Sequence, residues 1–336
     1  MKLYKDYPVI TATTKYAFAG ARLALLEKEL ITQTEYEQLK VCETVSDMAK
    51  LLSDTVYQGK FETGMDIGTL VEEETLRFKK DLYEIMPEDD YGTLDAFFRK
   101  YDHNNLKICL KTYLIGNQIN PDELSKVGSI TPEDLASYFE GERMVWLPFN
   151  VDFKRIQDIY KKEKEMRLID AIVDRAYYSE LLNTIKKLGD DFFVDYIYQM
   201  LDLKNILIFI RCKTTGLALD RFLLKSGYIS RDAFDKFIDE PNIDVAFSSP
   251  YFITYRDVYQ KGLETLEKTN SYAELETAVR NHLISILKEV QDSFFSIRPF
   301  LGYLLGKEHE ISLIKKAYIH IHNRIEFGKE RDLLYV

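Results

Sequence analysis

The chain has 336 residues, of which 46% are hydrophobic and 30% charged, a composition typical of a globular protein and not of a disordered segment or a coiled coil. Its net charge of −10 argues against a nucleic-acid-binding protein, which needs a basic face. The net charge does not exclude a local basic patch. No stretch approaches the roughly 18 uninterrupted apolar residues of a membrane-spanning helix.

The first predicted helix covers residues 15–30, and a second begins directly after it at Thr32. Thr32 is a typical N-cap, whose hydroxyl accepts a hydrogen bond from the first helical turn, and Glu35 completes a capping box. The same helix start recurs at Thr131 and at Ser230. The isoleucines before these three caps follow one another at intervals of 99 residues and are Ile31, Ile130 and Ile229. The chain therefore contains an internal repeat.

A second segment recurs near the end of each predicted unit. Its first two copies begin at Asp102 and Asp202, with Asn105 or Asn205 three residues on, and a looser third copy begins at Glu310. A spacing of three places each Asp and Asn on one helix face. Two interpretations follow: the aspartate caps its helix, which we favour, or the pair belongs to a partner-binding surface.

The stretches between the repeated helix starts and the second recurring segment also have helical character. Apolar residues keep helical spacing at 168–176 and 283–290, and the run 203–210 is apolar nearly all round. No convincing strand alternation occurs, so the sequence predicts an all-α protein, with an insertion in a loop near residues 241–249. Three tandem pseudo-symmetric repeats are predicted, at residues 1–128 with the N-terminal helix, 129–227 and 228–336. Spacing alone leaves open a closed ring or funnel and an open array.

No sequence pattern predicts catalysis or a cofactor site. A phosphate loop, a GxGxxG motif and a GxSxG nucleophile elbow are all missing. His320 and His322 are two residues apart and diverge on a helix, and His309 has no second histidine four residues on. We therefore expect no metal site, and histidines at exposed or interface positions. The three scattered cysteines favour reduced thiols.

Segments at both ends of the chain resemble a known family. The opening helix carries an Ala-Arg pair, and a Leu-x-x-Thr-x-Tyr turn follows it, here Ala21, Arg22, Leu52, Thr55 and Tyr57. The closing segment 296–321 has a proline and an LxYLL-K-E core, here Leu301, Tyr303, Leu304, Leu305, Lys307 and Glu308. These features are similar to the C-subunit family of V-type and archaeal A-type rotary ATPases, which includes the d subunit of the eukaryotic enzyme. Two positions depart from the family pattern, Leu207 and Leu313.

The resemblance implies a three-fold pseudo-symmetric helical funnel or socket that catalyses nothing itself. Such a protein lies on the cytoplasmic side of the membrane as a peripheral part of the complex, with no span of its own. Its implied partners are the proteolipid rotor ring of the membrane sector and the central stalk, between which it transmits torque for proton or sodium transport. The repeat alone also allows a different protein, a helical-repeat scaffold that binds a peptide or protein partner.

Basic residues on the recurring helices are the candidate partner contacts of this acidic chain. They would meet the acidic or carbonyl-rich ends of partner helices. The alternative, equally open, is pairing with acidic side chains of the same chain. The candidates are Arg22, Lys107, Lys111, Arg211 and Lys315.

Overall fold

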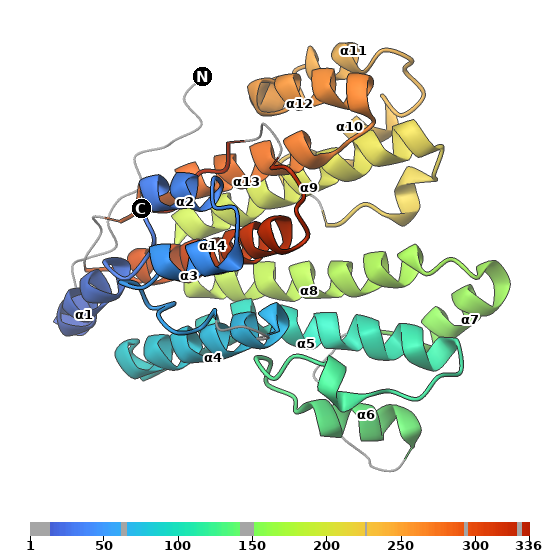
Figure 1. Ribbon diagram of the computed structural model, residues 1–336. Coiled ribbons are helices and arrows are strands. Elements are labelled where there is room, and N and C mark those ends of the chain that lie inside the picture. The colour runs from blue at the N-terminus through green and yellow to red at the C-terminus, as the bar shows by residue number, and fades with distance from the viewer. Residues whose placement is uncertain (1–13, 62–65, 142–150, 226, 292–294, 328–330) are drawn as a thin grey trace. The chain divides into compact units, whose positions relative to one another are not determined.

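The computed structural model describes residues 14–61, 66–141, 151–225, 227–291, 295–327 and 331–336. Regular structure within these ranges is helical and includes no strand, so the all-α prediction is confirmed. The chain divides into two compact units. Figure 1 labels the α-helices that make them up. We call residues 92–256 the mid-chain unit, and residues 5–91 with 257–336 the end-segment unit. This division does not test the three predicted repeats, which stay a prediction.

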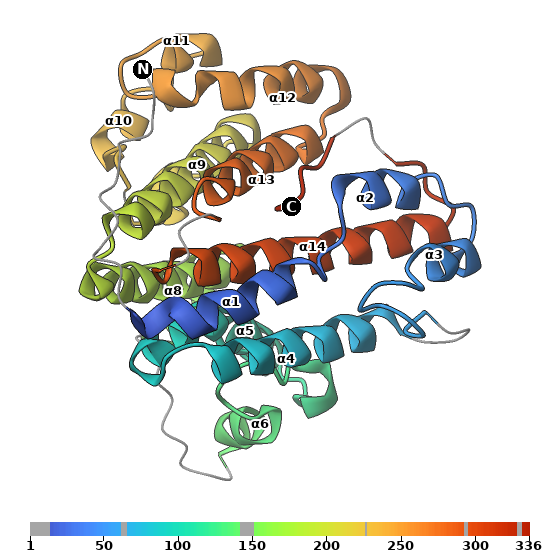
Figure 2. The same cartoon turned by 90° about the vertical axis from the view of Figure 1, so that its left-hand side faces the viewer.

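The end-segment unit is built around α14 (Arg298–His322). Its other α-helices are α1 (Ala17–Glu27), α2 (Gln33–Leu39), α3 (Val45–Leu51), α4 (Ile67–Ile85), α12 (Arg256–Thr269) and α13 (Ala273–Lys288). Helix α14 contacts α1, α3, α4 and α13, as Figure 2 shows for the red helix among the blue ones. The last helix of the chain therefore packs against the first ones.

The apolar core of this unit joins both ends of the chain. Tyr36, Leu39 and Met48 lie in one fully buried cluster with Leu313 and Ile314 of α14. Burying each such side chain stabilises the fold by roughly 1.5–3 kcal/mol relative to leaving it exposed. Leu313, which replaces the asparagine of the other two copies, is thus a core residue.

The mid-chain unit is a second helical assembly. Its helices are α5 (Tyr91–Leu114), α6 (Pro132–Glu140), α7 (Phe153–Glu163), α8 (Arg167–Leu188), α9 (Asp191–Thr215), α10 (Arg231–Asp235) and α11 (Ile243–Phe247). Helices α8 and α9 lie side by side. Ion pairs join α5 to the antiparallel α8, and they are Arg99–Glu180, Lys107–Asp174 and Lys111–Asp170. Helix α8 is therefore held on both sides.

The helix starts follow the predicted pattern in two of three cases. Thr32 Oγ1 accepts a hydrogen bond from the Glu35 amide at 3.2 Å, and the Glu35 carboxylate accepts one from the Thr32 amide at 2.7 Å, which confirms the capping box. Thr131 also caps its helix, α6, with its hydroxyl accepting a hydrogen bond from the Asp134 amide at 3.1 Å. Ser230 stands at the N-cap of α10, but its side chain makes no capping hydrogen bond, so that part of the prediction is wrong.

Two predicted boundaries differ from the structure. The first helix ends at Glu27 and not at Leu30. The segment 241–249, predicted as a loop insertion, contains the short helix α11, which Asn242 caps by accepting a hydrogen bond from the Asp244 amide. The turn-forming composition of this segment predicted a loop. The structure has a short helix there, because the Asn242 side chain caps its start.

A buried carboxylate holds the backbone just before each of the three helix starts. In every copy, a side chain inside a long helix accepts a hydrogen bond from the isoleucine amide that precedes the cap. The pairs are Asp102 with Ile130 at 3.0 Å, Asp202 with Ile229 at 2.9 Å and Glu310 with Ile31 at 2.7 Å. We call this contact the carboxylate clasp. It ties each helix start to the recurring long helix.

The carboxylate clasp corrects both interpretations of the Asp/Asn pairs. Asp102 and Asp202 lie within α5 and α9 and cap neither helix, and their exposed fractions of 1% and 0% rule out a partner surface. Asn105 instead exchanges two hydrogen bonds with the backbone of Ser125, at 2.7 and 2.8 Å. A buried carboxylate needs donors, and the amides of an approaching loop supply them.

Two glycines make the close approach of these loops possible. A Cβ atom on Gly128 would lie 2.0 Å from Asp102 Oδ1, and one on Gly227 would lie 2.2 Å from the Tyr198 carbonyl oxygen. Neither distance is compatible with a side chain. The loop before α6 and the loop before α10 therefore each need glycine at the point where they meet the long helix.

Candidate interaction surfaces

An exposed apolar and basic face lies on α1. Phe18 and Leu25 are 74% and 63% exposed, and Arg22 lies between them at helical spacing. The opposite side of α1, with Ala19 and Leu23, is buried. Among the described residues Arg22 forms no ion pair. We call Phe18, Arg22 and Leu25 the α1 face, and its two large apolar side chains are the kind that a partner covers.

Lys315 and Arg211 are also exposed. Lys315 lies on the outer side of α14, one turn before the partly exposed Ile319, and forms no ion pair within the described ranges. Arg211 lies in the last turns of α9, where its carbonyl oxygen accepts a hydrogen bond from the Thr215 hydroxyl at 2.6 Å. These two residues and Arg22 are the sequence-predicted contacts whose side chains face solvent.

Lys107 and Lys111 are engaged within the chain. Lys107 Nζ lies 2.5 Å from an oxygen of Asp174, and Lys111 Nζ lies 2.6 Å from an oxygen of Asp170. Both pairs link α5 to α8. For these two residues the structure therefore shows the in-chain pairing that was the alternative to a partner contact.

The signature residues Tyr57 and Lys307 lie inside the end-segment unit. Lys307 is fully buried, and its Nζ lies 2.6 Å from Glu310 Oε1 and 3.1 Å from Glu74 Oε1. The Tyr57 hydroxyl donates to Glu310 Oε1 at 2.7 Å. We call Tyr57, Glu74, Lys307 and Glu310 the buried charge cluster. It connects α4, α14 and the segment after α3.

Glu74 is ionised inside the buried charge cluster. Burial raises its pKa, but hydrogen bonds from Arg77 and Lys60 and the charge of Lys307 outweigh burial and hold the pKa at about 2. Arg77 Nη2 lies 2.8 Å from Glu74 Oε1. Such a paired cluster fixes one geometry, because removing one partner would leave a buried charge unpaired.

The expected exposure of the histidines is wrong for His103, which is 2% exposed, and for His309. His309 is buried in α14, and its Nε2 lies 2.9 Å from the Leu333 carbonyl oxygen. Burial lowers the pKa of the imidazole to about 4. His309 is therefore neutral at pH 7, and its Nε2 must carry the proton that it donates to Leu333.

The described ranges contain neither a metal site nor a membrane-spanning helix. No group of three or more His, Cys, Asp or Glu side chains there is arranged to hold a metal ion. No described helix combines the length and the apolar character needed to span a membrane.

The sequence matches the family described as ATP synthase (C/AC39) subunit over residues 19–326. A relative from Pyrococcus horikoshii, the C subunit of an A-type ATP synthase, is 23% identical over 98% of this chain and 93% of its own length. The C subunit of the A-type ATP synthase of Methanocaldococcus jannaschii is 23% identical over 95% of this chain and 85% of its own. The protein of the same name from Desulfurococcus is 22% identical over 98% and 93%. These matches bear out the resemblance that both ends of the sequence carry.

Proposed function

The chain belongs to the ATP synthase (C/AC39) subunit family, and from this membership we propose that it is the non-catalytic coupling subunit of a V/A-type rotary ATPase. In this role it links the central stalk to the proteolipid rotor ring of the membrane sector. It transmits torque between ATP turnover and ion transport, and it works as a peripheral subunit on the cytoplasmic side of the membrane.

The carboxylate clasp is the observation that best supports this proposal. A subunit that transmits torque must resist shear between its helices, and a loop that slides over a helix would absorb rotation. Hydrogen bonds to a charged acceptor each contribute roughly 1.5–3 kcal/mol, and the same contact is made three times. The buried charge cluster adds a further fixed point between α4 and α14.

The order of the clasps also supports the proposed three-repeat funnel. The long helix of the first predicted repeat holds the start of the second, and that of the second holds the start of the third. The last helix, α14, then holds the start of the first through Glu310 and Ile31. A cyclic order of contacts is what three units around one axis need.

The α1 face, Arg211 and Lys315 are the surfaces that we propose for the partners. Each presents an exposed basic side chain. Arg22 and Lys315 form no ion pair among the described residues, whereas Lys107 and Lys111 are engaged in ion pairs between α5 and α8. Cations pair favourably with the carbonyl-rich C-terminal ends of helices. The apolar side chains of the α1 face add surface whose burial stabilises a complex.

Deletion of this chain from cells that contain the ATPase tests the proposal. We expect membrane vesicles from these cells to lose ATP-driven ion transport, while the released catalytic sector still hydrolyses ATP. Adding back the purified chain should restore transport, and a wash without detergent should remove it again. Unchanged transport, or a chain found only as a free monomer, would overturn the proposal and favour a helical-repeat scaffold for another partner.

A further inference from the structure

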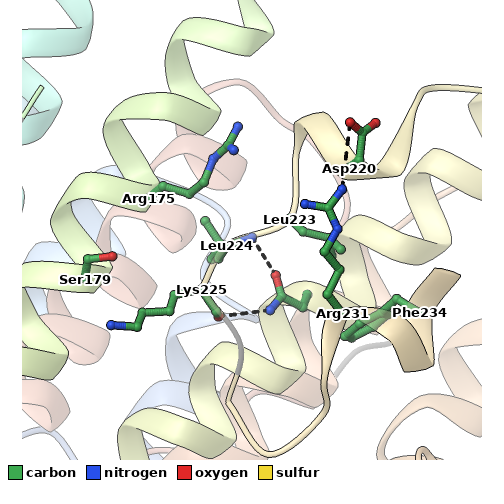
Figure 3. A pocket seen from close by; sticks show the side chains of 9 residues that line it. Arg175, Ser179, Asp220, Leu223, Leu224, Lys225, Arg231 and Phe234 are labelled. Carbon is green, nitrogen blue, oxygen red and sulfur yellow. Dashed lines mark hydrogen bonds and ion pairs between the residues drawn. The ribbon is translucent and has the colours of Figure 1, made fainter. Parts of the chain in front are cut away.

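The mid-chain unit contains a basic pocket of about 240 Å³. Figure 3 shows Arg175 and Ser179 projecting from one helix, α8, toward the loop residues Leu224 and Lys225, with Arg231 and Phe234 beyond that loop. Three of the charged side chains that line the pocket are cations, and the fourth is Asp220. This excess of positive charge occurs in a chain whose net charge is −10.

Arg175 is the central feature of this pocket, because its guanidinium group has no carboxylate partner in the described part of the chain. It is half-buried and donates hydrogen bonds to the carbonyl oxygens of Ala171, at 3.2 Å, and Arg221. Burial, together with repulsion from Arg155 and Arg231, lowers its pKa, and the charge of Asp220 acts against that shift. Carbonyl oxygens do not neutralise a guanidinium charge, and an anion bound in the pocket would compensate it more fully.

The other two cations are weakly engaged. Arg231 lies 3.8 Å from Asp220 and 3.7 Å from Asp235, and these exposed pairs contribute little. Lys225 is exposed and forms no ion pair among the described residues. Both side chains are therefore available to a further anion.

The loop that carries Lys225 is held in place from α9. Asn205 Oδ1 accepts a hydrogen bond from the Leu224 amide at 2.8 Å, and its Nδ2 donates to the Lys225 carbonyl oxygen at 3.3 Å. Asn205 therefore positions one wall of the pocket, while Arg175 on α8 forms another. A pocket whose walls are fixed before binding costs less conformational entropy when a ligand enters.

The size of the pocket limits what it binds. Pockets for drug-sized ligands and cofactors have volumes of about 300–1,000 Å³. A volume of about 240 Å³ is smaller and suits one charged group. Guanidinium groups bind carboxylates and phosphates through paired N–H donors.

We propose that this pocket binds a single oxyanion group, a phosphate or a carboxylate, through Arg175 and Arg231. The group comes either from free phosphate in solution or from an acidic side chain of a partner protein. The inference is independent of the proposed function, because it rests on the mid-chain unit alone.

Titration of the intact chain with inorganic phosphate tests the proposal. The Nε–H resonance of Arg175, assigned through the variant Arg175→Lys, is followed by ¹H–¹⁵N NMR. We expect a saturable shift with phosphate, and sodium chloride at matched ionic strength should not reproduce it. A linear drift that matches sodium chloride, with phosphate and with acetate alike, would overturn the proposal.

A charge-matched pair of variants separates this pocket from general charge effects. Arg175→Gln with Arg231→Gln should weaken phosphate binding by roughly tenfold or more. Lys154→Gln with Arg256→Gln removes the same charge from exposed positions outside the pocket and should leave binding unchanged. Equal binding by both variants would overturn the proposal. If the first variant fails to fold, the NMR titration of the wild-type chain decides.

A parallel titration with acetate distinguishes the two sources. Acetate presents the carboxylate of an Asp or Glu side chain without the partner. Saturable binding of acetate at Arg175 supports a partner carboxylate, and binding of phosphate alone supports free phosphate. If neither anion binds, the proposal is wrong.

Discussion

The carboxylate of Glu310 accepts a hydrogen bond at 2.7 Å from the backbone amide of Ile31, 279 residues earlier in the chain. The same carboxylate binds Lys307 and Tyr57, so one side chain belongs both to a carboxylate clasp and to the buried charge cluster. Its removal therefore disturbs two networks.

Replacing Glu310 by alanine should destabilise the end-segment unit by about 3–5 kcal/mol, because it leaves a buried lysine with one partner fewer and a buried amide with none. Glu310→Gln keeps an acceptor for Ile31 and should cost less. Urea unfolding followed by circular dichroism measures both. The control is Glu73→Ala at an exposed position of α4, and an equally small effect of Glu310→Ala would contradict the prediction.

Replacing Gly227 by alanine should destabilise the mid-chain unit by about 1–3 kcal/mol, because the new methyl group would overlap the Tyr198 carbonyl and the Asp202 carboxylate. Gly92→Ala is the control, since nothing lies within 4 Å of its Cβ position, and it should be neutral or stabilising by up to about 1 kcal/mol within α5. Thermal unfolding of the two variants measures this difference. If Gly227→Ala lowered the stability no more than Gly92→Ala does, the loop before α10 would be able to shift away from the new methyl group, and the prediction would be wrong.

His309 should make the end-segment unit less stable as the pH falls from 6.5 to 4. The folded pKa is about 4, below the ordinary value of 6.5, so the unfolded chain takes up the proton first. The stabilisation is complete above pH 6.5, and about 3 kcal/mol is lost by pH 4. His309→Gln keeps a donor for Leu333 and should remove this dependence. If the wild-type protein and the His309→Gln variant lost the same stability as the pH falls, this prediction would be wrong.

Asp202 should make the mid-chain unit less stable as the pH rises, which is opposite to the effect of His309. Burial raises its pKa from 3.8 to about 6, against hydrogen bonds from Ile229, Tyr255 and Tyr228. The folded state therefore binds the proton more tightly, so this stabilisation is complete below pH 3.8 and lost as the pH rises through 6. Asp202→Asn should cost roughly 2–3 kcal/mol more at pH 4 than at pH 7.5. An equal cost at the two pH values, by urea unfolding, would show that Asp202 stays charged.

Reversing the charge at Arg22 and Arg211 together should weaken assembly with the ATPase by about tenfold or more, because each cation would become an anion at a proposed contact. The fold should change by less than about 0.5 kcal/mol, since both side chains are exposed. The membrane-bound fraction measures assembly. Lys28→Glu with Lys187→Glu is the charge-matched control, and equal binding of both variants would exclude the two arginines as contacts.

Local signals in the sequence predicted the helix starts well. The capping box of Thr32 and Glu35 depends on residues three positions apart, so the sequence contains all of its information. The role of Asp102 was missed, because its donors lie 27 and 28 residues further on and spacing does not tell a buried helix face from an exposed one.

A usable signal for the carboxylate clasp was nevertheless present. Gly128 and Gly227 recur at the 99-residue interval, immediately before the repeated helix starts. The equivalent position in the first copy is Glu29, and that copy is held by Glu310, whose side chain is longer than an aspartate by one methylene group. The two copies with the shorter aspartate have glycine at this position, and the copy with the longer glutamate has a residue with a side chain. The shorter carboxylate requires the loop to approach the long helix more closely, and only glycine permits that approach.

The basic pocket had no sequence signature. Arg175 and Arg231 are 56 positions apart and come from α8 and α10. Arg231 directly follows the repeated helix start at Ser230, but Arg175 lies in no repeated segment, so only packing brings the two side chains together. The pairing of Lys107 and Lys111 with α8 likewise depends on helix packing that spacing does not encode.

The contact between Ile31 and Glu310 also sets an order of events during synthesis. Every group of the mid-chain unit is made before α14, so its two clasps can form while the chain is still being translated. The first helix start cannot form its carboxylate clasp before Glu310 has been synthesised. At about 5–20 residues per second, the sequence separation of 279 between Ile31 and Glu310 corresponds to tens of seconds. During that interval Ile31, Tyr36 and Leu39 lack the helix that buries them, and this segment is the one that a chaperone would need to protect.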